Sequence, residues 1–206
     1  MMMCRSDPVV HGPLFICVLI TAAAALFGAG RFTWNRLKFE GPTETLSQVR
    51  LSEDERAALS AAVLAELGPP WPNLSAEEQA PNLRIKLVDL NGDHIPEVIA
   101  QLTGRFWCGA TGNCAFRVFR KSSKTYESML VTKDINSYQG FTVTRQRSGG
   151  YFDLVFNRHE SATSQTLFVY KFRDGKYQAS GCYGADWSVI GDEAAPAKEP
   201  RITPCR

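Results

Sequence analysis

Short alternating segments dominate the chain from Leu83 onward, and they constrain the fold more than any other feature. The run Leu83-Arg84-Ile85-Lys86-Leu87 alternates apolar and polar residues with a period of two, which is the pattern of a half-buried strand. Similar segments predict strands at 83–87, 98–102, 115–120, 126–132, 141–146, 151–157 and 166–172. Because the turns are short, and Asp174-Gly175 is a two-residue hairpin signal, we expect antiparallel pairing in a meandering sheet.

One segment before these strands has the pattern of a helix with both ends marked. Ser52 and Glu55 have the spacing of a capping box, and Gly68-Pro69-Pro70 is a stop signal. An apolar stripe at helical spacing consists of Leu59, Val63 and Leu67. Ser75 and Glu78 repeat the capping pattern and predict a second, shorter helical turn. The predicted fold class is therefore α+β, an N-terminal helix packed on a meandering antiparallel sheet stapled by disulfides.

The N-terminal segment from Pro13 to Gly30 contains no charged residue and predicts export. It ends in Gly28-Ala29-Gly30, small residues that are typical of a signal-peptide cleavage site. Its length also reaches the lower limit for a membrane-spanning helix, so a retained anchor stays open. We divide the chain into a signal peptide or anchor at 1–30, a linker at 31–50 and one α+β domain at 51–206. The protein is expected to be periplasmic or secreted, or anchored to the cytoplasmic membrane.

The predicted domain contains four cysteines: Cys108, Cys114, Cys182 and Cys205. An even number in a small exported domain indicates two disulfides, in any of three connectivities. We favour Cys108–Cys114, because two glycines and an asparagine between them can turn a short loop back on itself. Cys182–Cys205 would then hold the C-terminal tail. A zinc site is disfavoured, because the spacing lacks the paired cysteines of such sites.

The loop between the first two predicted strands carries the clearest candidate chemistry. Asp89, Asn91, Asp93 and Glu97 occupy positions 1, 3, 5 and 9 of this loop, and the carbonyl of Ile95 occupies position 7. Oxygen donors at alternating positions can surround one cation, and this donor set favours Ca²⁺. An EF-hand is disfavoured, because Ala100 stands where its bidentate glutamate would be and the flanks alternate like strands. The alternative is a metal-free polar turn around Asn91-Gly92.

This loop resembles the signature of FG-GAP-type and related secreted calcium-binding β-repeats over residues 88–102. The resemblance implies a loop between two strands, with Asp89, Asn91, Asp93 and Glu97 as calcium ligands. The chain departs from it at His94, where the family has glycine and the backbone often needs a positive φ. It also has a single copy of the loop rather than the many of a propeller. The loop together with FWCGATGNCAFRVFRK is similar to uncharacterised bacterial secreted proteins, which implies no activity.

Three further groups of residues carry weaker hypotheses. His159, Glu160, Asp153 and Asp89 could assemble a hydrolase site, although no nucleophile motif accompanies them. Turn-associated aromatics could line a groove or cover a core edge, and they are Trp71, Phe106, Trp107, Tyr183 and Trp187. The basic run Arg117, Arg120, Lys121 and Lys124 is interpreted as one solvated strand face and its turn, and the alternative is a surface for an anionic partner such as lipid headgroups.

Composition narrows the possible functions. Lysine and arginine number 23 against 21 acidic residues, so the net charge of +2 is too small to gather nucleic acid. The expected function is an exported, non-enzymatic binding or interaction domain of the cell envelope, stabilised by Ca²⁺. Its expected partner is an envelope protein or glycan, with membrane contact only through an uncleaved N-terminal segment. The alternatives are an envelope hydrolase and an inhibitor-like protein without a small ligand.

Overall fold

The computed structural model describes residues 36–67, 82–104, 106–132, 135–188 and 199–205. Strand residues make up 55% of this part of the chain and helical residues 11%. The predicted α+β class is therefore wrong: the protein is mostly β, its strands form two sheets, and its helix follows a first strand instead of standing at the N-terminus. Alternation predicted seven of the eleven strands in the described residues, but a period of two does not encode how strands divide between sheets.

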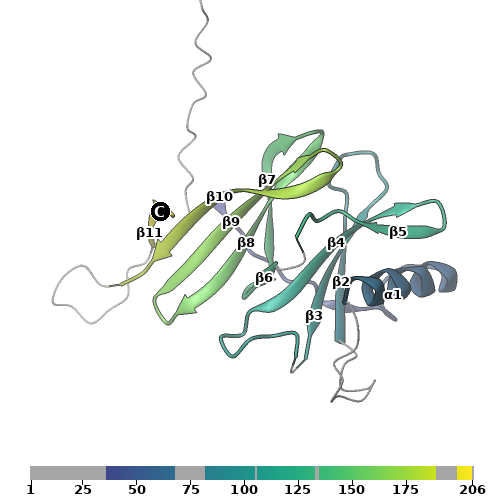
Figure 1. Ribbon diagram of the computed structural model, residues 1–206, viewed down its shortest axis with the longest axis horizontal. Coiled ribbons are helices and arrows are strands. Elements are labelled where there is room, and N and C mark those ends of the chain that lie inside the picture. Colours follow the sequence, from purple (N-terminus) through teal and green to yellow (C-terminus); the bar gives the residue numbers. More distant parts are fainter. Residues whose placement is uncertain (1–35, 68–81, 105, 133–134, 189–198, 206) are drawn as a thin grey trace, which may run out of the picture. The chain divides into compact units, whose positions relative to one another are not determined.

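The first sheet has the order β1-β2-β3-β4-β5, and β6 also pairs with β4. Its strands are β1 (Glu44–Thr45), β2 (Asn82–Val88), β3 (Glu97–Thr103), β4 (Cys114–Ser122), β5 (Thr125–Ser128) and β6 (Asn136–Ser137). The second sheet has the order β11-β10-β9-β8-β7. Its strands are β7 (Phe141–Ser148), β8 (Tyr151–Ser161), β9 (Ser164–Arg173), β10 (Lys176–Asp186) and β11 (Arg201–Pro204). All pairs within both sheets are antiparallel, as expected (Figure 1).

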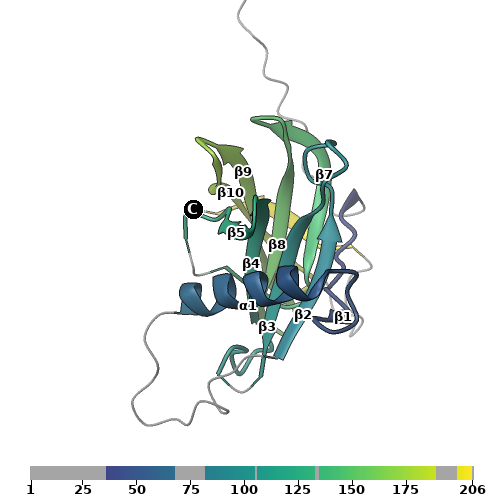
Figure 2. The ribbon, with the colours of Figure 1, turned by 90° about the vertical axis from the view of Figure 1, so that its right-hand side faces the viewer.

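The helix α1 (Glu53–Leu67) begins at the predicted capping box. The backbone N–H of Ser52 donates to Glu55 Oε2 at 2.7 Å, and the N–H of Glu55 donates to Ser52 Oγ at 3.2 Å. Leu59 and Val63 are buried against one face of the first sheet, which the helix crosses (Figure 2). The predicted stop signal at 68–70 and the turn at Ser75 lie outside the described residues.

Three apolar layers hold the fold together. The central layer lies between the two sheets, where residues such as Phe116 and Phe156 are fully buried. The second lies between α1 and the first sheet. The third covers the outer face of the second sheet, where Leu37 and Phe39 pack against Val155 and its neighbours. Both sheets are therefore buried on both faces over much of their length.

Residues 36–50, within the segment predicted as a linker, contribute to these layers. Glu40 and Phe141 exchange two backbone hydrogen bonds of 3.0 Å, and Val49 is buried against the α1 layer. Residues Phe32–Arg206 form one compact unit. Within the described residues no helix is long and apolar enough to cross a bilayer, and the predicted targeting segment lies outside them.

Both predicted disulfides are present. Cys108–Cys114 closes the turn before β4, with a Cα–Cα distance of 3.9 Å. Cys182–Cys205 joins β10 to the residue after β11, with a Cα–Cα distance of 5.3 Å. The favoured connectivity is therefore confirmed, and the bridges are compatible with a protein exported to an oxidising compartment.

Candidate functional site

The predicted cation loop connects β2 to β3. Asp89, Asn91, Asp93 and Ile95 lie between the two strands, and Glu97 is the first residue of β3. The register pairs Val88 with Glu97, so the loop closes a hairpin and all five residues come from one short segment.

Hydrogen bonds to the loop's own backbone define its shape. Asp89 accepts the N–H of Gly92 at 2.6 Å with Oδ1 and the N–H of His94 at 3.0 Å with Oδ2. Asn91 Oδ1 accepts the N–H of Asp93 at 2.9 Å, and Asn91 Nδ2 donates to Asp93 Oδ2 at 2.8 Å. These bonds are typical of side chains that stabilise turns. Most polar side chains of the loop therefore have hydrogen-bond partners within the loop itself.

The backbone of this loop explains the glycine and the histidine. Gly92 has a φ of 85°, and His94 has a φ of 66°. The sequence indicated that position 6 needs a positive φ, and His94 adopts one although it is not glycine. Histidine tolerates this region better than branched residues do.

Glu97 differs from the other carboxylates because it is buried. Its residue is 4% exposed, and Oε2 accepts the backbone N–H of Leu90 at 2.8 Å. Burial raises the pKa of Glu97, and the nearby charges of Asp93 and Asp89 raise it further. Burial also acts to raise the pKa of Asp89, but the N–H groups of the loop outweigh it and hold that pKa below its usual range. Three carboxylates therefore interact here, and one of them is kept away from water.

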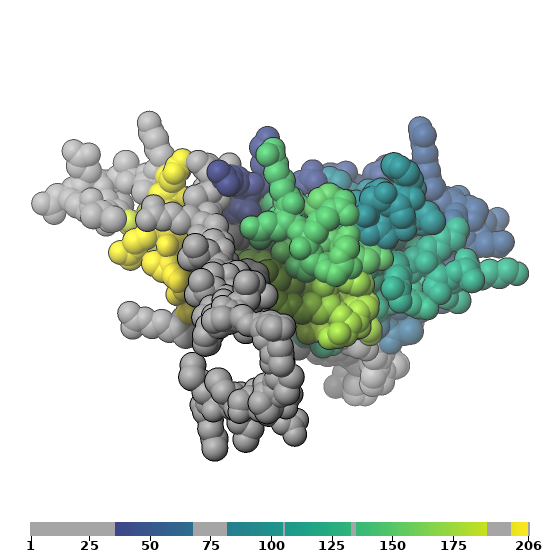
Figure 3. Space-filling model, turned by 90° about the horizontal axis from the view of Figure 1, so that it is seen from above, coloured from purple at the N-terminus to yellow at the C-terminus, as the bar shows by residue number. Residues whose placement is uncertain are grey.

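The loop of the first sheet is attached to the β7–β8 hairpin of the second. Arg147 donates from Nη1 to the carbonyl of Asn91 at 2.7 Å and to that of Gly150 at 3.0 Å. Its guanidinium lies 3.8 Å from the ring centroid of Phe152, whose N–H donates to the carbonyl of Leu90 at 2.8 Å. In Figure 3 this loop, in blue-teal, lies beside the green β7–β8 hairpin on the surface. The loop is thus part of the junction between the two sheets.

Three residues of the hydrolase hypothesis lie on β8, whereas the fourth, Asp89, lies in the β2–β3 loop. Asp153 is 1% exposed and lies six residues before His159, about 20 Å along a strand. His159 Nδ1 lies 3.1 Å from the carbonyl oxygen of Thr111, and its ring stacks on Tyr138 with centroids 4.7 Å apart. Glu160 forms an ion pair of 2.7 Å with Arg158. The structure therefore does not bring Asp153 and His159 together.

The aromatic and basic groups singled out in the sequence are also dispersed. Trp107 packs in the apolar layer between α1 and the first sheet, whereas Tyr183 and Trp187 pack on the outer face of the second sheet. Trp71 lies outside the described residues. Arg117 is buried in β4, so the basic run is not one solvated face. Its other described members include Lys121, which forms an ion pair of 2.7 Å with Glu55.

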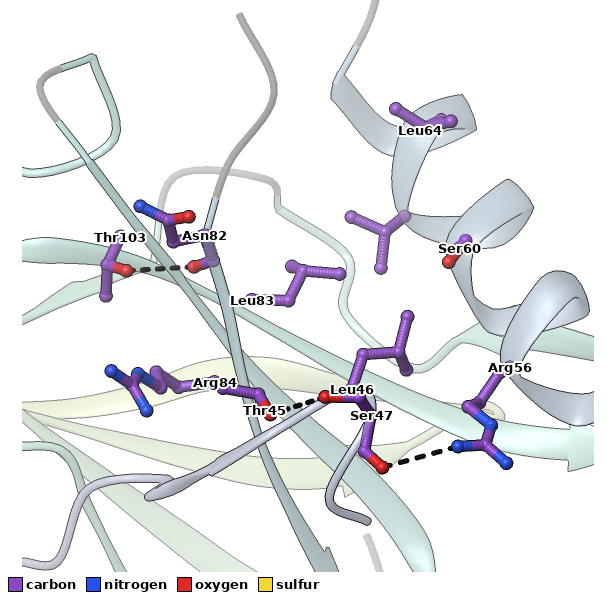
Figure 4. Close-up of a pocket in the computed structure, with 11 residues that line it drawn as sticks. Thr45, Leu46, Ser47, Arg56, Ser60, Leu64, Asn82, Leu83, Arg84 and Thr103 are labelled. Carbon is purple, nitrogen blue, oxygen red and sulfur yellow. Dashed lines mark hydrogen bonds between the residues drawn. The ribbon is translucent and has the colours of Figure 1, made fainter. Parts of the chain in front are cut away.

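Sequence reasoning missed a groove of about 790 Å³ between α1 and the edge of the first sheet (Figure 4). It is lined by Thr45, Leu46, Ser47, Arg56, Ser60, Val63, Leu64, Asn82, Leu83, Arg84 and Thr103. These residues come from four separate segments, so no local pattern connects them. The sequence feature that could have indicated this groove is Leu64, an apolar residue of the helix that lies outside its buried stripe.

The fold and these sites define a mostly β, two-sheet, disulfide-bridged domain with a carboxylate-rich hairpin loop. No family model, no curated protein and no solved structure matches this chain. Its function is therefore inferred from its own residues.

Proposed function

We propose that this protein is an exported, non-enzymatic binding domain of the cell envelope, stabilised by Ca²⁺ at the loop from Asp89 to Glu97. The two disulfides support export, because such bridges persist in oxidising compartments. The uncharged segment 13–30 supports delivery across the cytoplasmic membrane, as a cleaved signal or an anchor. An envelope protein or a glycan is the proposed partner.

The observation that carries the calcium proposal is the buried carboxylate of Glu97 beside Asp89 and Asp93. A carboxylate that is shielded from water and close to two like charges is costly to ionise. A divalent cation would relieve both costs. The donor set also fits, since it consists of oxygen atoms, which are the ligands that Ca²⁺ prefers.

The proposed ligands are the side chains of Asp89, Asn91, Asp93 and Glu97 and the carbonyl of Ile95. Among the described residues, no group of three or more His, Cys, Asp or Glu side chains is already placed to hold a metal. Calcium would therefore have to draw the carboxylates closer together. Each carboxylate oxygen can accept a second interaction while it keeps its bond to a loop amide. Because Arg147 joins this loop to the second sheet, an ion here would stabilise the junction between the sheets.

Thermal unfolding of the purified protein in excess Ca²⁺ and in chelator tests this proposal. A ligand that binds only the folded state stabilises it by about 2.7 kcal/mol at a hundredfold excess over its Kd. We expect a rise in Tm with calcium that disappears in Asp93→Ala. Glu97→Gln should also lose the response, yet be more stable than the wild type in chelator, because its buried charge is gone.

Asp174→Asn is the matched control, since Asp174 lies in another positive-φ turn far along the chain from this loop. It should keep the full calcium response. If millimolar calcium leaves the Tm of the wild type unchanged, the loop is an ordinary polar turn. A hydrolase screen adds a separate check, because turnover that is lost in His159→Ala would overturn the non-enzymatic assignment.

A further inference from the structure

The groove between α1 and the first sheet has a positive charge without an acidic counterpart. Arg56 and Arg84 are the charged residues among those that line it. Arg56 Nη1 donates to the carbonyl of Ser47 at 3.3 Å, and Arg84 Nη1 donates to the carbonyl of Thr43 at 3.2 Å. Within the described part of the chain neither guanidinium forms an ion pair, and each has one side-chain hydrogen bond, to a backbone carbonyl.

Other basic residues of the same region are neutralised by neighbours. Lys86, on the same strand as Arg84, pairs with Glu40 at 2.6 Å, and Lys121 pairs with Glu55, the neighbour of Arg56 in α1, at 2.7 Å. These two cations are therefore paired, whereas the two arginines of the groove form no ion pair within the described residues. A guanidinium that keeps several free N–H groups matches a carboxylate with two parallel hydrogen bonds.

The groove also presents apolar surface. Leu64 is 60% exposed, and it follows Arg56 and Ser60 at intervals of four residues on one face of α1. Figure 4 shows Leu46 and Leu83 between β2 and the helix that carries Arg56, while Arg84 extends from the opposite side of β2 at the rim of the groove. Arginine is enriched in the cores of protein–protein interfaces, and an exposed apolar side chain near it adds surface that a protein partner can bury. Inorganic phosphate or a polyanionic sugar would leave Leu64 without a contact.

We propose that this groove binds an acidic segment of a partner protein, with an apolar side chain of that segment against Leu64 and its carboxylates on Arg56 and Arg84. The inference rests on the proposed function as a binding domain, and it names the surface and the chemistry of the partner. The two arginines favour a partner segment with negative charge. The exposed leucine favours a segment that also has an apolar side chain.

The test is fluorescence anisotropy with the full protein and a labelled peptide that repeats Glu-Leu-Glu. We expect salt-dependent binding that Arg56→Ala and Arg84→Ala each weaken by about tenfold, the factor that corresponds to one charge-assisted hydrogen bond. Leu64→Ser should weaken binding of this peptide but not of a Glu-Ser-Glu peptide. Arg84 and Leu64 are exposed and Arg56 is half-buried, so we expect Tm values close to that of the wild type in all three variants.

Arg173→Ala is the control, because Arg173 is an exposed arginine on the second sheet, and it should bind like the wild type. Binding of the Glu-Leu-Glu peptide that does not change in Arg56→Ala and Arg84→Ala, or no binding, overturns the inference. Equal binding of polygalacturonate with no effect of Leu64→Ser also overturns it, in favour of a glycan.

A parallel pull-down from envelope extract distinguishes failure of the groove proposal from failure of the proposed binding function. A stoichiometric partner that Arg56→Ala and Arg84→Ala both still retain would leave the binding function standing and remove the groove from it. If neither peptide nor extract yields any bound species, both the groove and the binding function fail.

Discussion

Asp153 has an unusual environment for a carboxylate. It lies on β8, is 1% exposed, and neither of its oxygens has a hydrogen-bond partner among the described residues. Thr142 Oγ1, on the neighbouring strand β7, is also buried without a partner in this part of the chain. By alternation Asp153 shares the outer face of the second sheet with Val155, which belongs to an apolar layer. An unpaired buried carboxylate opposes folding.

We therefore expect Asp153→Leu to stabilise the protein by about 2 kcal/mol, since a buried polar group without a hydrogen bond costs free energy that an apolar side chain of similar size does not. Asp153→Asn should gain less, because its amide stays buried without partners. Urea denaturation measures both. A loss of stability in Asp153→Leu would indicate that Asp153 pairs in solution with a cation, for which Lys171, one register step beyond the Leu154–Tyr170 pair, is the nearest candidate by position.

At the scale of the element, the N-terminus of α1 links the helix to β4. Glu55 completes the capping box with Ser52 and forms an ion pair of 2.7 Å with Lys121. The hydrogen bond from Lys121 and the bonds from Ser52 lower the pKa of Glu55 from 4.5 to about 2. Because the folded-state pKa is the lower one, the stabilisation is present above pH 4.5 and is lost as the pH falls towards 2.

Glu55→Gln is expected to destabilise the protein by about 1 kcal/mol at neutral pH, the usual effect of losing a helix cap. The difference from the wild type should shrink between pH 4.5 and 2, which denaturant titrations at several pH values can follow. Glu53→Gln is the control from the same helical turn, since Glu53 bonds to neither Ser52 nor Lys121. A pH-independent difference for Glu55→Gln would mean that its charge has no part in the cap.

At the scale of the whole molecule, the two sheets are held together by a layer of aromatic rings. Phe156 of the second sheet lies edge-on to Phe116 of the first, with centroids 5.4 Å apart, and contacts Tyr170 at 5.6 Å. All three are buried. This layer, together with Arg147 and the loop at Asn91, joins the two sheets.

Phe156→Ala should therefore cost about 3–5 kcal/mol in the free energy of unfolding, because it removes a ring that contacts both sheets and leaves a cavity. Chemical denaturation is the measurement, with Leu64→Ala as an exposed control that changes stability little. A loss below 1 kcal/mol would contradict a packed interface between the sheets.

Local signals in the sequence determined the elements of this protein. The capping box of Ser52 and Glu55 marks the start of α1. Asp174-Gly175 forms the β9–β10 turn, with φ of 51° and 80°, and alternation marks most strands. These features depend on residues that are close in the chain, so one sequence is enough to predict them. The pairing Cys108–Cys114 was predictable for the same reason.

Three features could not be predicted from one sequence: the partition of strands into two sheets, the burial of Glu97 and Asp153, and the groove lined by Arg56 and Arg84. Each depends on contacts between segments far apart in the chain. A period of two indicates that a strand has two different faces, but it does not indicate what covers each face. The physical reason is that burial is a property of the packed layers, whereas periodicity is a property of one segment.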